Sequence, residues 1–223
     1  MGEYDNFLPR PTMEGFLRGV DLRSLKGLTE QEIKDAINSA CEFFGIPYPV
    51  FVQDLSNFKF GSTMFVSIDP TSFGDDILYY NMNELAQLHV GTKEAFSLIM
   101  THECGHRILQ SIRFEGPYNG SWQGELAADF LMGCRAGLFN MPQINNVIEG
   151  LGKTQGSKSH PKGYLRANFI KHGLLIAQQI RNESRPVSIQ DLLNEYGKHY
   201  QEMLPQIKKD EKEIYNLLER MRR

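Results

Sequence analysis

The pattern of hydrophobic residues changes near Gly91, and this change constrains the fold more than any other feature of the chain. Before Gly91, short runs rich in β-branched and aromatic residues predict about three strands. These runs cover residues 50–52, 58–68 and 77–80. After Gly91, apolar residues recur at helical spacing, with breaks at Gly, Pro and Ser. Strands followed by helices favour an α+β fold, in which a small N-terminal sheet packs on the first of the later helices and the C-terminal half is helical.

Local signals place the ends of two helices within this scheme. Thr29 and Glu32 have the spacing of a capping box, and Gly45 is suited to end the helix that they begin. Thr92 is suited to cap a second helix that runs to about Ile112. Acids and bases alternate over residues 208–223, which predicts an amphipathic helix with a solvated face.

The size and composition of the chain favour a single domain. The 223 residues are 41% hydrophobic, which is enough for one substantial core. We therefore expect one domain over 1–223, with a helix and the small sheet in 1–91 and a helical part in 92–223. The oligomeric state cannot be predicted from these features.

Charge and cysteine content exclude several classes of partner. A net charge of −3 argues against nucleic acid as a partner, because phosphate binding needs a basic surface. Three cysteines form neither a disulfide framework nor a Cys-x-x-Cys pattern, which suits a reducing compartment. No stretch approaches the roughly 20 apolar residues of a membrane span, and no signal peptide is visible at the N-terminus. We expect a soluble cytoplasmic protein without a membrane partner.

The segment 101–106 contains the residues most suited to chemistry. His102 and His106 are one helical turn apart, so both imidazoles can face a single ion, and zinc is the usual metal for imidazole with a carboxylate. Glu103 lies about 100° round the helix from His102, close to the metal without being forced to bind it. It is therefore the candidate base that takes a proton from the water activated by the metal. Cys104 is expected to point away from the metal, into the core.

A second segment supplies the third ligand that a catalytic zinc requires. Glu125 and Asp129 lie four residues apart in a largely apolar stretch, so both face the same way from a second helix. We expect Glu125 to bind the ion and Asp129 to accept a hydrogen bond from the other nitrogen of a ligand histidine. Two acids buried together would repel each other without a cation, which favours a metal beside them.

These two motifs together resemble those of the gluzincin metallopeptidases. The short gap between His106 and Glu125 is most similar to that of the minigluzincins and the CAAX prenyl protease and HtpX-type branch. The resemblance covers 101–166 and includes a downstream His-Pro pair with an Arg at the same offset, here His160 and Arg166. It implies a zincin-like fold, a Zn²⁺ cofactor and a peptide or protein substrate. It also implies that His160 helps to bind the substrate carbonyl or its oxyanion, and that Arg166 braces this region by pairing with a carboxylate.

Three alternatives and several minor residues complete the expectations. The chain departs from the membrane-embedded members of that branch, so their prenylated substrates are not carried over. A regulatory protease that cuts one specific partner, and a non-catalytic zinc-binding module, are alternatives to a general peptidase. His160 as an ordinary surface-loop residue is a third. His89 and His172 are expected to be structural or surface residues. Asn81 and Asn83 are expected to form a turn or cap a helix, with binding of a peptide carbonyl as the alternative.

Overall fold

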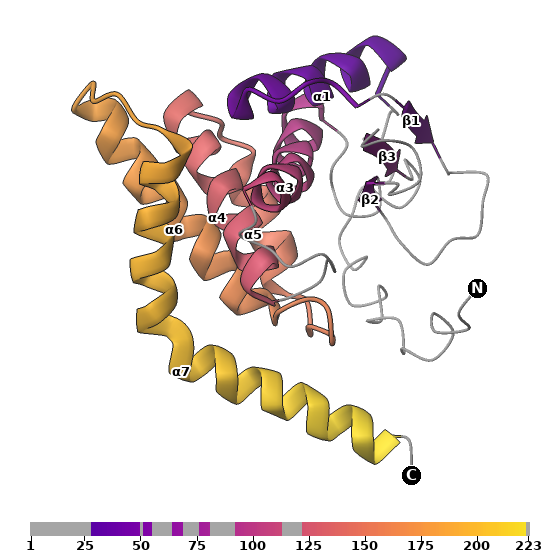
Figure 1. Ribbon diagram of the computed structural model, residues 1–223, viewed down its shortest axis with the longest axis vertical. Coiled ribbons are helices and arrows are strands. Elements are labelled where there is room, and N and C mark those ends of the chain that lie inside the picture. Colours follow the sequence, from indigo (N-terminus) through magenta and orange to yellow (C-terminus); the bar gives the residue numbers. More distant parts are fainter. Residues whose placement is uncertain are drawn as a thin grey trace.

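A computed structural model describes residues 28–49, 51–54, 64–68, 76–80, 92–112 and 122–221 (Figure 1). The helices of this part are α1 (Glu30–Phe44), α3 (Lys93–Ser111), α4 (Trp122–Phe139), α5 (Ile144–Gly152), α6 (Gly163–Asn182) and α7 (Ile189–Met221). The strands are β1 (Phe51–Asp54), β2 (Met64–Ile68) and β3 (Asp76–Tyr80).

The expected helix ends of α1 and α3 are confirmed. The Thr29 hydroxyl accepts a hydrogen bond from the Glu32 amide at 3.2 Å, and the Glu32 carboxylate accepts one from the Thr29 amide at 2.8 Å. Gly45 ends α1 with a left-handed backbone, φ 65°, which glycine adopts without steric cost. At the start of α3, the Thr92 hydroxyl accepts from the Ala95 amide at 3.1 Å. The Thr92 cap fixes where α3 begins, and hence which turn of that helix carries His102.

Helix α4 lies at the centre of the core and packs most closely on α6. Glycines on both helices make this approach possible. A Cβ added at Gly133 would lie 2.1 Å from the carbonyl oxygen of Ile170, and one added at Gly173 would lie 2.2 Å from that of Phe130. The two backbones therefore meet without intervening side chains, and this contact holds α4 in one register against α6.

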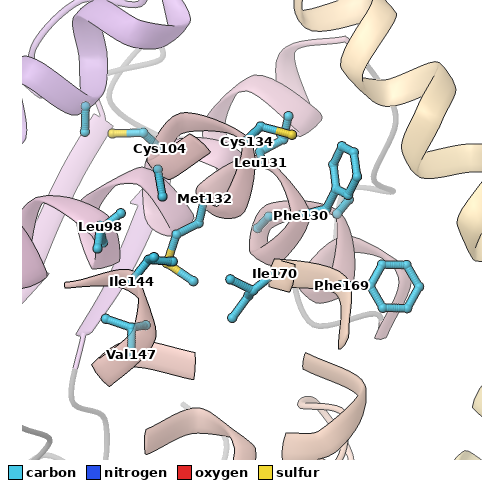
Figure 2. Packing of buried hydrophobic residues seen from close by; sticks show 14 of the residues in the cluster. Leu98, Cys104, Phe130, Leu131, Met132, Cys134, Ile144, Val147, Phe169 and Ile170 are labelled. Carbon is cyan, nitrogen blue, oxygen red and sulfur yellow. The ribbon is translucent and has the colours of Figure 1, made fainter. Parts of the chain in front are cut away.

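Helices α3, α5 and α7 complete the core around α4. Figure 2 shows Leu98 of α3, Met132 of α4 and two residues of α5, Ile144 and Val147, gathered in one cluster. The first part of α7 is anchored by Tyr196, which is 1% exposed and donates its hydroxyl hydrogen to the carbonyl oxygen of Gln123 at 2.8 Å.

Figure 1 also shows that α7 bends and that its last part extends away from the other helices. The helix contains Pro205, whose ring cannot fit a straight helix.

The expectation of an α+β fold is wrong, because the body of the molecule is helical. Every buried hydrophobic side chain in the described residues lies in a helix. The three strands have only four or five residues each, in the order β1-β3-β2, with β1 parallel and β2 antiparallel to β3. Of their side chains, that of Val52 is described, and it lies half-buried at the margin of the helical core.

The strands contribute less to the core than their sequence pattern predicts. Helix α4 is apolar on nearly every side, so helices pack around it and a sheet is not needed to cover it.

Across the ranges that the structure describes, none of the helices has the apolar length needed to cross a membrane. Helix α4 is the most apolar of the long ones, and its polar residues Glu125, Asp129 and Arg135 are buried within the protein.

Candidate metal centre

Helices α3 and α4 cross where the two metal motifs lie. A Cβ added at Gly105 would meet Cα and Cβ of Ala128 at 3.3 Å, so the absence of a side chain at Gly105 allows the close crossing. His102 and His106 project from α3 on one side of this point, and Glu125 projects from the first turn of α4. All three side chains are nearly buried, with exposed fractions of 5–9%. The crossing brings together residues that are about 20 positions apart in the sequence.

The donor atoms of these three residues are spaced as ligands of one ion would be. Nε2 of His102 lies 3.2 Å from Nε2 of His106. Oε2 of Glu125 lies 3.5 Å from Nε2 of His102, and the other oxygen, Oε1, lies 3.4 Å from Nε2 of His106. A tetrahedral zinc with bonds of about 2.0–2.2 Å places its ligand atoms roughly 3.3–3.6 Å apart. The three residues therefore fit a zinc ion in both donor chemistry and spacing.

The hydrogen bonding of Glu125 also favours a cation at this site. Its Oε2 is buried and has no hydrogen-bond partner, although Nε2 of His102, Nε2 of His160 and Nη2 of Arg166 lie 3.5, 3.7 and 3.9 Å away. Burial alone would raise the pKa of this carboxyl group, but the two imidazoles of α3 outweigh burial and hold the pKa well below its usual range. A buried carboxylate oxygen that is ionised and accepts no hydrogen bond of good geometry is suited to a cation.

Asp129 lies behind His102 and joins it to α6. Oδ1 of Asp129 is 2.9 Å from Nδ1 of His102. This contact is short but poorly aligned, because Nδ1 makes no hydrogen bond of good geometry. Arg166 of α6 binds both oxygens of the same carboxylate, with Nε donating at 2.7 Å and Nη2 at 2.9 Å. Burial raises the pKa of Asp129, but Arg166 and His102 outweigh burial, so the net shift is downward and Asp129 is an anion.

Glu103 lies on α3, beside the three candidate ligands, and is half-buried. Burial raises the pKa of its carboxyl group, and the nearby His102 and His106 oppose part of this shift. A carboxylate with a raised pKa binds a proton more readily near neutral pH, which is what a general base requires.

His160 stands in the loop before α6, next to the cluster but outside it. Its Nε2 is 3.7 Å from Oε2 of Glu125, and its side chain is 53% exposed. Its Nδ1 lies 2.9 Å from the hydroxyl oxygen of Ser159, and the hydroxyl of Ser157 accepts from the His160 amide at 3.0 Å. The indole N–H of Trp122, at the start of α4, donates to the carbonyl oxygen of Ser157 at 3.1 Å. Roles for Trp122, Ser157 and Ser159 were not predicted from the sequence, although two serines so close to His160 were a usable signal.

The bent part of α7 also holds this loop. Asp210 is 2% exposed and accepts hydrogen bonds from the Tyr164 hydroxyl and from the Lys162 ammonium group, the latter at 3.0 Å. Glu213 accepts a second bond from Lys162 at 2.6 Å. The sequence predicted a solvated face for this stretch, and Asp210 is an exception because it is buried against residues just after His160.

The structure thus brings together His102, Glu103, His106, Glu125, Asp129, His160 and Arg166 in one place. Asn81, Asn83 and His89 lie outside the described residues, and His172 of α6 stacks on His199 of α7 with ring centroids 3.9 Å apart. No family model, curated protein or solved structure matches this chain. Function is therefore inferred from the geometry of the site.

Proposed function

We propose that this protein is a zinc-dependent peptidase that hydrolyses peptide bonds. The observation that carries the proposal is the spacing of 3.2–3.5 Å among the donor atoms of His102, His106 and Glu125, together with Glu103 on the same helix. A zinc ion held by these three residues would have a position left for water or substrate, as catalytic zinc sites do. When bound there, zinc would polarise the scissile carbonyl and lower the pKa of water.

Glu103 would act as the base in this reaction. It would take a proton from the attacking water on one carboxylate oxygen and pass that proton to the nitrogen of the leaving amine. Its raised pKa, caused by burial, supports this role, because the protonated form is then accessible during turnover.

His160 would donate a hydrogen bond to the oxyanion. If Nδ1 accepts from the Ser159 hydroxyl across 2.9 Å, the ring proton resides on Nε2, the nitrogen nearer to Glu125. An N–H group fixed at the edge of the metal centre is well placed for charge that develops on a carbonyl oxygen. The half-exposed position of His160 keeps it in reach of a substrate that enters from solvent.

We also propose a reducing, cytoplasmic location. All three cysteines are buried and none is in a disulfide, which supports a compartment that keeps thiols reduced. A peptide or protein remains the proposed substrate.

The test is proteolysis of a peptide library by the zinc-loaded protein, with the products sequenced by mass spectrometry. We expect cleavage by the parent protein and a loss of several orders of magnitude in Glu103→Gln, which has nearly the same shape but cannot take a proton. The matched control is Glu149→Gln, because that side chain is 71% exposed on α5.

Three outcomes separate this proposal from its alternatives. Equal cleavage by the parent and Glu103→Gln would contradict the role of Glu103. Zinc binding without cleavage of any peptide would favour a non-catalytic zinc module. Cleavage of one partner protein alone would favour a regulatory protease.

A further inference from the structure

Two buried cysteines face each other between α1 and α3. Sγ of Cys41 lies 3.7 Å from Sγ of Cys104, and the two side chains are 1% and 3% exposed. Cys41 is on α1, and Cys104 stands on α3 between His102 and His106. The sulfurs are thus in van der Waals contact, and only a modest movement separates them from bonding distance.

A positive group lies beside this pair. Nη1 of Arg107 is 3.6 Å from Sγ of Cys41 and also donates to the carbonyl oxygen of Pro47 at 3.0 Å. A buried guanidinium at this distance stabilises the negative charge that develops on sulfur when it attacks an oxidant. Cys134, the third cysteine, lies on α4 and is fully buried, so it offers a matched thiol outside the pair.

We propose that Cys41 and Cys104 form a reversible disulfide when the protein meets a peroxide. The sulfur of Cys41 attacks one oxygen of hydrogen peroxide, the O–O bond breaks, and the products are a sulfenic acid and water. The sulfur of Cys104 then attacks the oxidised sulfur, the S–O bond breaks, and a second water leaves. In total, two thiols and one hydrogen peroxide give one disulfide and two waters. A dithiol reverses the change by thiol–disulfide exchange.

The disulfide would act on the metal centre because of where Cys104 stands. A disulfide bond is about 2.0 Å long, so the two sulfurs must approach each other by roughly 1.7 Å. That movement pulls on the turn of α3 that carries both histidine ligands, whose present spacing suits an ion. The oxidised protein should therefore hold zinc more weakly, a consequence that rests on the proposed zinc site.

The experiment oxidises the full-length protein with hydrogen peroxide, blocks the remaining thiols and measures intact mass without reductant. We expect one blocked thiol in the oxidised protein, against three in protein reduced with dithiothreitol before blocking, and a Cys41–Cys104 peptide after digestion. Cys134→Ser should behave like the parent protein, whereas Cys41→Ser should not form the linkage. Zinc affinity, measured by competition with a chromophoric chelator, should fall about tenfold on oxidation of the parent and recover on reduction.

Two results would overturn the inference. If oxidation leaves Cys41 and Cys104 unlinked while the protein stays folded, the proposed disulfide is contradicted. If the disulfide forms but zinc affinity is unchanged, the proposed effect of the disulfide on the metal centre is contradicted. If the reduced protein binds no zinc, the proposed function fails, but the mass measurement still decides whether the disulfide forms.

Discussion

Nδ1 of His102 lies 2.9 Å from Oδ1 of Asp129, so a fully buried carboxylate stands behind one of the candidate zinc ligands. The same carboxylate binds Arg166 through both oxygens, and it therefore links α3, α4 and α6 at the metal centre. We therefore expect the orientation of the His102 ring, and with it the position of its Nε2, to depend on Asp129 remaining an anion.

Replacing Asp129 with asparagine should weaken zinc binding about 10- to 100-fold, because the amide cannot replace both carboxylate contacts. It should also lower the free energy of unfolding by roughly 3 kcal/mol, since the buried Arg166 loses its counter-charge. Chelator competition and urea unfolding measure the two effects. The exposed Glu149→Gln change should alter neither, and an Asp129→Asn protein with the parent's zinc affinity would contradict the role assigned to Asp129.

The affinity for zinc should depend on pH through His102. Burial lowers the pKa of this imidazole, but Asp129 outweighs burial and raises it from 6.5 to about 9 in the metal-free protein. Zinc needs the unprotonated nitrogen, so affinity should rise about tenfold per pH unit between pH 6.5 and 9 and then level off.

The stability of the metal-free protein should depend on pH in the opposite direction from the zinc affinity. The raised folded-state pKa stabilises this protein fully below pH 6.5, and that contribution is lost as the pH rises through about 9. Chelator competition across this range measures the zinc affinity, and equal affinities at pH 7 and pH 9 would contradict this explanation.

The packing of α4 on α6 should not tolerate a methyl group at Gly133. The new Cβ would lie 2.1 Å from the Ile170 carbonyl oxygen, so the helices must separate, at a cost of about 1–3 kcal/mol in the free energy of unfolding. Gly197→Ala is the matched control, because nothing lies within 4 Å of its added Cβ, and alanine should stabilise α7 by roughly 0.5–1 kcal/mol. Urea denaturation that gives the same free energy for both variants would be inconsistent with a backbone contact between α4 and α6.

Replacing His160 should lower turnover without weakening zinc binding, whereas replacing a metal ligand should weaken zinc binding. His160→Ala should keep the zinc affinity of the parent while turnover of a peptide substrate falls about 100- to 1,000-fold, because one oxyanion donor is lost. Ser159→Ala should show a smaller loss, since it removes only the contact with Nδ1. Unchanged turnover in His160→Ala would return His160 to the class of surface-loop residues, and the metal centre would stand.

Local chemistry explains why much of the site could be predicted from the sequence. The caps at Thr29 and Thr92 act over three residues, and helix geometry alone sets His102 and His106 on one face. The spacing of Glu125 and Asp129 likewise requires only that α4 be a helix. These are short-range relations, and the structure contains all of them.

Other features depend on contacts between distant segments and left no local signal. The partner of Arg166 is Asp129, 37 positions earlier, and the partner of Tyr164 is Asp210, 46 positions later. The prediction of the fold class was wrong for a related reason. The β-branched and aromatic runs form strands of only four or five residues, and whether helices or a sheet build the core is decided by how α4 is covered.

The most direct test is the zinc content of protein purified without chelator, measured by elemental analysis. We predict close to one zinc per chain in the parent and in Glu149→Gln, and a sharp loss in both His106→Ala and Glu125→Ala, because a site with two ligands holds zinc weakly. Circular dichroism should show that both variants remain folded. Full zinc occupancy in His106→Ala and Glu125→Ala would contradict the metal centre on which the proposed function depends.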